Sequence, residues 1–227
     1  MLFITNTHEK WVFFLLYSCL TIFFYVYLHQ INKKLYIMLN EDVILKNYDD
    51  FKKRLETYVG IEETKNLIDS LGGDEKVMDA PFANTNDTGF AYRGSLIETL
   101  LSLTTYAVKI NQLLPTNKQA DIKSIVKVGL LHHLAKVLLY EVNDNTWEVT
   151  NRGMVYKYNS DLLGALRVGE RSTLLACNAG VKFTEYEFEA MRIMDKTNDD
   201  NYAKYYSSSL STVIKQANEI VTLINKK

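Results

Sequence analysis

The chain of 227 residues has few of the residues that build disulfide frameworks, histidine metal sites and flexible linkers. It contains two cysteines, two prolines, ten glycines and four histidines. Cys19 and Cys177 cannot form a disulfide framework and fit a reducing compartment. The scarcity of proline and glycine leaves little room for linkers, so we expect one domain behind an N-terminal extension. No glycine-rich phosphate loop, Cys-x-x-Cys pair, nucleophile elbow or Rossmann fingerprint can be read.

The chain also lacks a large excess of charge of either sign. The formal net charge is −1 and the sequence pI is about 6.4, so no long-range field attracts a polyanion. Nucleic acid is therefore not expected as a partner. With 47% hydrophobic and 23% charged residues, the chain has the composition of an ordinary globular protein.

Residues 1–37 form a hydrophobic N-terminal segment with two open interpretations. Residues 11–28 carry no charge and are bounded by lysines. The length of this uncharged stretch is at the threshold for a membrane-spanning helix. Lys33 and Lys34 would then keep the domain cytoplasmic, while Glu9 fits a cleaved signal peptide less well. Alternatively, Met38 is the natural start of a cytoplasmic protein and the upstream residues come from a misassigned start codon. The domain proper spans residues 38–227 in either case.

Hydrophobic periodicity predicts an all-α domain with one small β-hairpin. The expected helices cover residues 42–59, 62–71, 95–114, 121–140, 161–180, 184–194 and 210–224. Asp121 is expected to cap one of them, Thr184 and Glu187 form a capping box, and Pro115 ends another. The hairpin is expected to pair residues 147–150 with residues 154–158. Residues 80–94 and the acidic stretch DEKVMDA before them are interpreted as loop.

Two adjacent histidines lie in the apolar stretch GLLHHLAKV, residues 129–137. The apolar residues around His132 and His133 point all round the helix axis, so both side chains are expected in or beside the core. They are interpreted either as buried imidazoles with hydrogen-bond partners, or as a remnant site in which His132 is a general base or binds a ligand.

Several motifs in this order resemble the HD-domain metal-dependent phosphohydrolases, in particular their phage and bacterial members. The stretch APFANTNDTGFAYRGSLIET is similar to the family's APAS-x-N…AYEGGL-x-EH, and LLHHLAK is similar to LLHD-x-x-K. A hairpin follows, then ALRVGERS where the family has LGHGEKS, AMRIM where it has A-x-R-x-H, and Ala-Asn where it has a late Ala-Asp. The resemblance covers about residues 78–224 and implies an HD-like helical bundle.

The metal-ligand positions depart from the family. They fall at Thr99, His132, His133, Val168, Met194 and Asn218, and only His132 keeps the family's residue type. Thr, Val and Met cannot replace the imidazoles and carboxylates that hold divalent ions in such sites. Outside residues 1–37 the chain has no third histidine. No metal cofactor is therefore expected, the alternative being a rebuilt site for an ion such as Mn²⁺ or Mg²⁺.

The sequence accordingly predicts a catalytically degenerate HD-type protein that binds a protein or a phosphorylated ligand. The expected binding residues are Arg93, His132, His133, Lys136, Arg167 and Glu170. The alternative is a divergent phosphohydrolase acting on nucleotides or phosphate esters, with His132, Lys136 and Glu98 as candidate catalytic residues. In the family resemblance, Glu98 corresponds to the last glutamate of AYEGGL-x-EH and Glu170 to the glutamate of LGHGEKS. A third interpretation, a membrane-tethered adaptor, depends on residues 1–37 being translated.

Overall fold

The computed structural model describes residues 41–85, 88–162, 164–193 and 207–225. The chain divides into two compact units, Met1–Val43 and Ile44–Lys227, and the second carries nearly all of the structure discussed below. The expected membrane segment, residues 11–28, and the family ligand position Met194 lie outside the described residues. Within the described ranges, no helix has both the length and the apolarity needed to span a bilayer.

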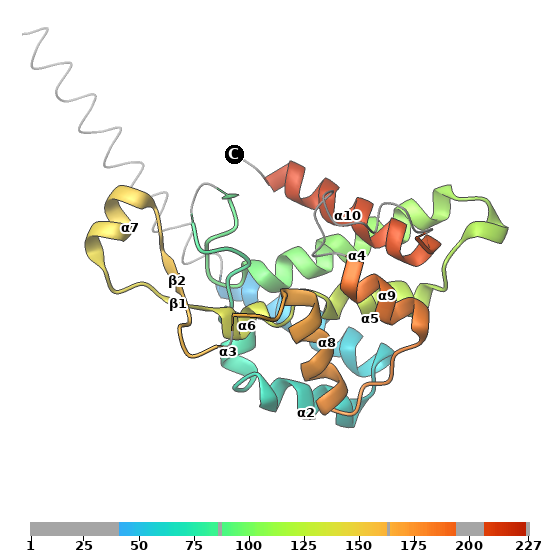
Figure 1. Ribbon diagram of the computed structural model, residues 1–227, viewed down its shortest axis with the longest axis horizontal. Coiled ribbons are helices and arrows are strands. Elements are labelled where there is room, and N and C mark those ends of the chain that lie inside the picture. Colours follow the sequence, from blue (N-terminus) through green and yellow to red (C-terminus); the bar gives the residue numbers. More distant parts are fainter. Residues whose placement is uncertain (1–40, 86–87, 163, 194–206, 226–227) are drawn as a thin grey trace, which may run out of the picture. The chain divides into compact units, whose positions relative to one another are not determined.

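The predicted fold class is confirmed, because the structure is mostly helical with one small antiparallel sheet (Figure 1). The elements are a helix at residues 41–58, α2 Ile61–Ser70, α3 Asp74–Asp79, α4 Ser95–Leu113, the 3₁₀ turn η2 Thr116–Lys118, α5 Ile122–Leu131, α6 Lys136–Leu139, β1 Tyr140–Val142, α7 Thr146–Arg152, β2 Tyr156–Tyr158, α8 Val168–Asn178, α9 Glu185–Ile193 and α10 Ser209–Asn225.

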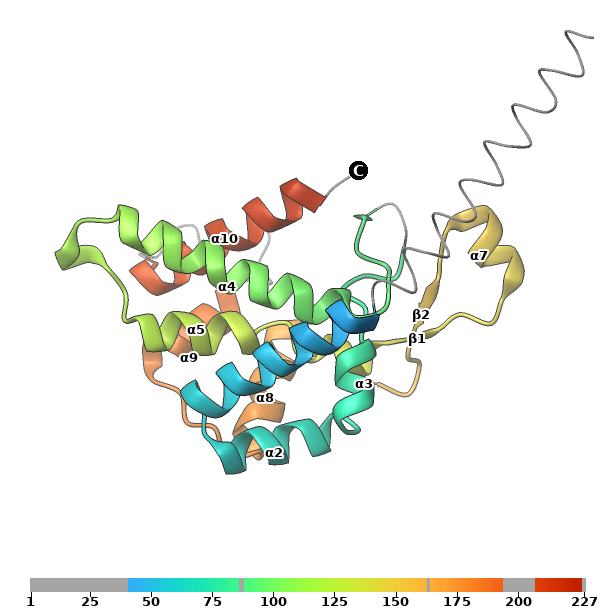
Figure 2. The same ribbon diagram turned by 180° about the vertical axis from the view of Figure 1, so that it is seen from behind.

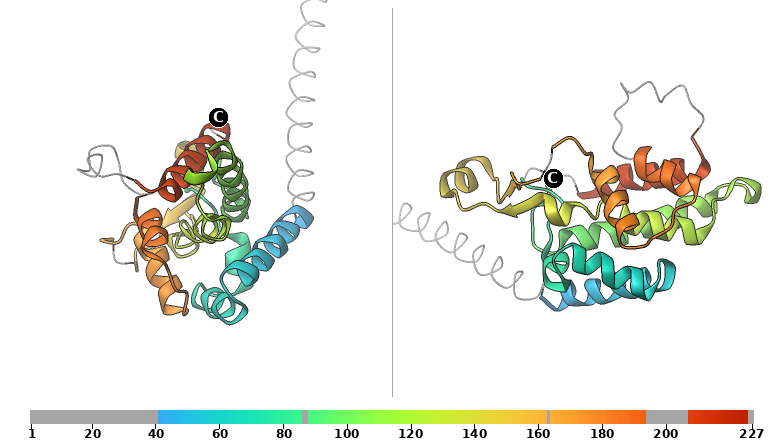
Figure 3. Two further views of the ribbon diagram at one scale, coloured as in Figure 1. Left: turned by 90° about the vertical axis from the view of Figure 1, so that its right-hand side faces the viewer. Right: turned by 60° about the horizontal axis from the view of Figure 1, so that its bottom comes forward.

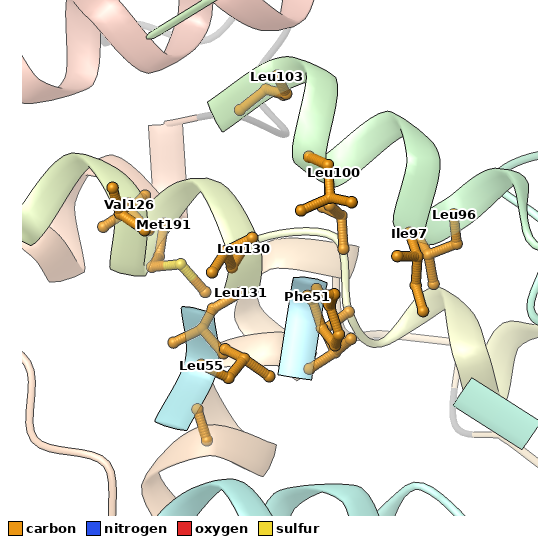
Figure 4. Close-up of a cluster of buried hydrophobic side chains, with 14 of the residues drawn as sticks. Phe51, Leu55, Leu96, Ile97, Leu100, Leu103, Val126, Leu130, Leu131 and Met191 are labelled. Carbon is orange, nitrogen blue, oxygen red and sulfur yellow. The ribbon is translucent and has the colours of Figure 1, made fainter. Parts of the chain in front are cut away.

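The core forms where α4, α5 and α10 pack together, with α8 and α9 against them (Figure 1). Its largest side chains come from the helix at 41–58, α4 and α5, and they meet in the interior (Figure 4). Phe51, Leu55, Leu100 and Leu130 are fully buried. Burying each such side chain contributes on the order of 1.5–3 kcal/mol, so this cluster is the main source of stability.

The helix at residues 41–58, blue in Figure 2, is predicted by a row of apolar residues that includes Val43, Leu45, Tyr48, Phe51 and Leu55. Tyr48, Phe51 and Leu55 are buried as predicted, but Ile44 takes the first buried position, and Val43 and Leu45 are 47% and 52% exposed. Steps of four and three residues starting at 44 place a single row on one side of the helix. The sequence offers apolar residues at 43, 44 and 45, so periodicity alone did not choose among them.

The predicted helix ends are confirmed where a side chain sets them. The carboxylate of Asp121 accepts a hydrogen bond from the Ser124 backbone at the start of α5. At α9 the Glu187 carboxylate accepts from the Thr184 N–H (2.8 Å), and the Thr184 hydroxyl accepts from the Glu187 N–H (3.3 Å). Each satisfies backbone donors that have no partner within the helix.

The predicted hairpin is half correct. Its second strand is β2, but the first is β1, which pairs antiparallel to it with Tyr140 opposite Tyr158. Residues 147–150, predicted as a strand, belong to α7, and the connection between the strands carries this helix (Figure 3). The reason is local, because the Asn145 side chain caps the first turn of α7 and Gly153 ends it with a φ of 61°.

Three further boundaries differ from the predictions. The helix expected at residues 121–140 is interrupted at residues 132–135, which form a turn between α5 and α6. The helix expected from residue 161 begins only at Val168, and the stretch DEKVMDA, interpreted as loop, forms α3. Buried Val77 anchors α3 to the core, which a pattern of surface acids did not reveal.

One close approach between α4 and α5 yields a stability prediction. A Cβ added at Gly129 would lie 2.6 Å from the Thr104 hydroxyl oxygen, which is itself bonded to the Leu100 carbonyl. We expect Gly129→Ala to lower the free energy of unfolding by about 1–3 kcal/mol despite alanine's better helix propensity. Urea denaturation measures this. Adding Thr104→Ala removes the clashing oxygen and restores most of the loss, and equal losses with and without Thr104→Ala would contradict the close-packing explanation.

Candidate functional site

The turn at residues 132–135 is where the elements carrying the expected site residues meet. The His132 N–H still bonds to the Val128 carbonyl as the last bond of α5, and the chain then leaves the helix axis. The Ala135 N–H donates to the hydroxyl of Ser172 on α8 over 2.9 Å in a buried position. This bond satisfies a backbone donor that the interrupted helix leaves open, and it ties the turn to α8.

His132 and His133 lie in contact inside the protein. Their ring centroids are 3.9 Å apart, and the two residues are 0% and 7% exposed. No hydrogen-bond partner among the described residues reaches either nitrogen of His132 or the Nδ1 of His133. The expectation of core histidines is met, but the expected hydrogen bonds are largely missing. Full burial also keeps His132 from contacting a surface ligand in this conformation.

Burial keeps both imidazoles neutral. Desolvation lowers the pKa of His132 from 6.5 to about 4, against a smaller opposing effect of the Gly129 and Val128 carbonyls. The pKa of His133 also lies well below 6.5, first because of burial, and then because a proton on His133 would be repelled by Lys136 and by a protonated His132. A charged imidazole in this buried position is unfavourable, so near neutral pH neither ring carries the second proton that a general acid would give up.

Asn218 of α10 brings a distant part of the chain to this pair. The His133 Nε2 lies 3.2 Å from the Asn218 side-chain oxygen, across 85 residues of sequence. Replacing either residue by an acid would bury a charge, whereas the imidazole and the amide form a neutral pair. The resemblance assigned both positions to carboxylate ligands, and the structure brings these two positions into contact.

Phe82 and Lys136 close the site toward the loop of residues 80–94. The Phe82 ring packs edge-on against His133 with centroids 5.0 Å apart, and the Lys136 ammonium lies 3.4 Å from the centroid of the same ring. The ammonium also donates to the Phe82 carbonyl over 2.8 Å. Lys136 is therefore engaged in holding the loop. The sequence did not single out Phe82 or Ser172, since neither carries a chemical signal that distinguishes it from ordinary core and helix residues.

The remaining expected residues divide between α4 and α8. Thr99 is buried on α4 and donates to the Ser95 carbonyl over 2.6 Å, whereas Glu98 is exposed and accepts from the Tyr92 hydroxyl. Half-buried Val168 begins α8, where the Glu170 carboxylate accepts from the backbone N–H of exposed Arg167. Thus Glu98, Arg167 and Glu170 each have a local structural role.

Arg93 lies apart from the histidine pair in the contacts that the structure shows. Its guanidinium forms an ion pair of 2.7 Å with Asp79 at the end of α3. The hydroxyl of Tyr156 lies close enough to both for their charges to influence its pKa, which burial raises. Arg93 thus joins the segment before α4 to the end of α3.

A surface cavity of about 360 Å³ lies between α3 and the hairpin. Its apolar wall comes from the end of α6 and the two strands, and its rim from α3. Among its lining residues are Val137, Tyr140, Val142, Tyr156 and Glu75, and His132 and His133 are not. The cavity is therefore a separate feature from the family's metal position.

The residues present at the family's metal position do not fit a metal ion. Thr99 uses its hydroxyl within α4, Val168 has no donor atom, and His133 already contacts Asn218. In the parts of the chain that the structure describes, no three His, Cys, Asp or Glu residues gather in a way that could hold an ion. A divalent ion needs several such ligands at once, and the described residues at this position do not supply them.

Comparison with known proteins adds no relative: the chain matches no protein-family model, no curated protein and no solved structure.

The buried histidines predict how stability depends on pH. Because the folded-state pKa of His132 is about 4 and its ordinary value is 6.5, the unfolded chain binds more protons in this window. We expect the free energy of unfolding to fall as the pH drops from 6.5 toward 4, His132 alone contributing up to about 3 kcal/mol.

Urea denaturation of the wild-type chain and of His132→Leu at several pH values between 7.5 and 4.5 tests this expectation. Titrating carboxylates contribute equally to both proteins, so the difference between the two curves isolates His132. The variant is expected to lose less stability on acidification, and part of the dependence remains because His133 is also buried neutral. Parallel curves would show that His132 is not held neutral by the fold.

Proposed function

We propose that the protein is a catalytically inactive HD-type helical domain that acts by binding a partner protein. The observation that carries the proposal is the contact between His133 and Asn218 in a buried, neutral site. In the family that the sequence resembles, these two positions hold carboxylates that share a metal ion. Here a direct imidazole–amide contact occupies the place of the ion, and it needs no charge to be stable.

The chemistry of the site supports an inactive domain. A hydrolase of this type needs a bound ion to activate water, or a general base with a pKa near the working pH. The pKa of His132 is about 4 and its ring is completely buried, so it is poorly placed to accept a proton from a bound water. Glu98 and Glu170 are engaged with Tyr92 and the α8 N-terminus.

A protein partner fits better than a phosphorylated ligand, because two of the expected phosphate-binding cations are already engaged within the protein and the three lie on separate elements. Arg93 pairs with Asp79, and the Lys136 ammonium donates to the Phe82 carbonyl. Arg167 is exposed at the start of α8. Tight phosphate sites bring several donors to one point, and this arrangement spreads them over separate elements.

Restoring the family's ligands tests both the HD-type assignment and the loss of the metal. The variant Thr99→His, His133→Asp, Asn218→Asp combines with His132 to restore four of the family's six ligand positions, as two imidazoles and two carboxylates. We expect the wild-type chain to bind no stoichiometric Mn²⁺ in titration calorimetry and the triple variant to bind one ion and to gain thermal stability with Mn²⁺.

Two controls make this experiment specific. Replacing Thr99→His by Thr105→His, on the exposed side of the same helix, should abolish the gain, and so should adding His132→Ala. Stoichiometric Mn²⁺ binding by the wild-type chain together with release of inorganic phosphate from a phosphomonoester would establish the divergent phosphohydrolase instead. A folded triple variant that binds no ion would contradict the HD-type arrangement of these positions.

A further inference from the structure

One edge of the small sheet carries backbone groups with no partner in the described structure. The Asn159 N–H bonds to the Leu139 carbonyl and the Asn143 N–H to the Val155 carbonyl, so the cross-strand bonds fall on odd-numbered residues of β1. The N–H and C=O groups of Tyr140 and Val142 therefore point away from β2. No hydrogen bond to these four groups is found among the described residues.

The other edge of the sheet makes one bond to the chain itself. The Tyr156 N–H, which points away from β1, donates to the Asn84 carbonyl in the loop before α4 over 3.2 Å. The two edges of the hairpin thus differ, since the loop contacts the β2 edge at Tyr156, whereas no such bond is found on the β1 edge among the described residues. An open edge with paired donors and acceptors is the backbone feature that an added strand uses.

The side chains of the open strand lead into the cavity. Tyr140, Val142, Tyr156 and Tyr158 share one face of the sheet, because Tyr140 pairs with Tyr158 and Val142 with Tyr156. Tyr140, Val142 and Tyr156 line the 360 Å³ cavity. Parts of this face remain exposed to solvent, because Val142 is 74% exposed and Tyr158 is 58% exposed. A third strand beside β1 would place apolar side chains opposite Tyr140 and Val142, on this same face.

On the opposite face of β1, an exposed carboxylate favours a basic residue on an added strand. Glu141 is exposed on that face. Lys157, which lies opposite Glu141 on β2, forms an ion pair of 3.0 Å with Asp144. Glu141 has no ion pair within the described structure, so a basic residue opposite it on an added strand is favoured. Pairing of β1 with a second copy of itself centred on this residue would instead set two Glu141 carboxylates against each other, which is unfavourable.

We propose that the edge of β1 binds an extended peptide segment of a partner protein as a third strand, with a basic residue between two apolar residues. The basic side chain lies opposite Glu141, and the apolar ones lie opposite Tyr140 and Val142 beside the cavity. This inference rests on the proposed function only in that the protein acts by binding, and it uses none of the residues at the histidine pair.

The probe is a fluorescently labelled, end-blocked peptide, Ser-Thr-Val-Lys-Val-Thr-Ser, titrated with the full-length chain and followed by fluorescence anisotropy. Hydrogen exchange read out by NMR is measured in parallel. Saturable binding is expected, with slowed exchange at the Tyr140 and Val142 amides. Because neither measurement involves metal or hydrolysis, an active enzyme would overturn the proposed function without affecting this result.

Two variants locate the binding. Val142→Pro removes the backbone N–H of residue 142, which β1 does not use within the hairpin, so the fold is expected to be retained. The affinity for the peptide is expected to fall about tenfold. Val142→Thr keeps the N–H and is the matched control. Glu141→Lys is expected to weaken binding of this peptide, whose central residue is Lys. The same variant is expected to bind a peptide with Glu at the central position about fivefold more tightly than the Lys peptide.

No binding at millimolar peptide, or binding that Glu141→Lys leaves unchanged, would overturn the proposal. So would self-association in sedimentation that protects the Tyr140 and Val142 amides without peptide, because a second copy would then occupy the edge.

Discussion

The interruption of the central helix at His132–Ala135 is the constraint on which the other contacts of the site depend. An uninterrupted helix would separate adjacent side chains by about 100°, whereas the turn stacks two imidazoles with centroids 3.9 Å apart. It also directs the Ala135 N–H to Ser172 and His133 to Asn218, so that α8 and α10 are both fixed to the same few residues. Close packing here leaves both rings dry and neutral.

The effect of this turn extends to the hairpin through a series of contacts. His133 and Lys136 hold Phe82, and the Phe82 N–H donates to the Ser95 hydroxyl at the start of α4. The following loop reaches the sheet, where the Asn84 carbonyl accepts from Tyr156. The loop therefore bonds to the β2 edge of the hairpin, while the β1 edge has no such bond among the described residues, so the core turn and the proposed peptide edge are parts of one connected arrangement.

The sequence predicted those features that residues near one another determine. The long stripe of α4, the α10 helix, the Asp121 cap and the box of Thr184 and Glu187 all follow from spacings of three and four residues. The break at His132 could not be predicted in this way, since no proline or glycine marks it. It is set by Ser172 and Asn218, which are distant in sequence, and tertiary contacts override local propensity in such places.

The hairpin and the site show two further limits of sequence patterns. Trp147 and Val149 have high strand propensity, yet Asn145 and Gly153 supply a cap and an end that make the segment helical. At the site, the motif order grouped Arg93, Arg167 and Lys136, but ion pairs and loop contacts that no motif records hold them on separate elements. Burial, rather than residue type, then decides what His132 can do.

The replacements at the family's ligand positions are physically consistent with one another. A buried carboxylate without an ion is strongly unfavourable, as is a charged imidazole. Asn218 in place of an acid and His133 held neutral avoid both penalties, and the Thr99 hydroxyl is satisfied within its own helix. Reintroducing a single carboxylate would therefore be destabilising unless an ion came with it. The position that the resemblance assigns to chemistry thus contributes to the core of this protein.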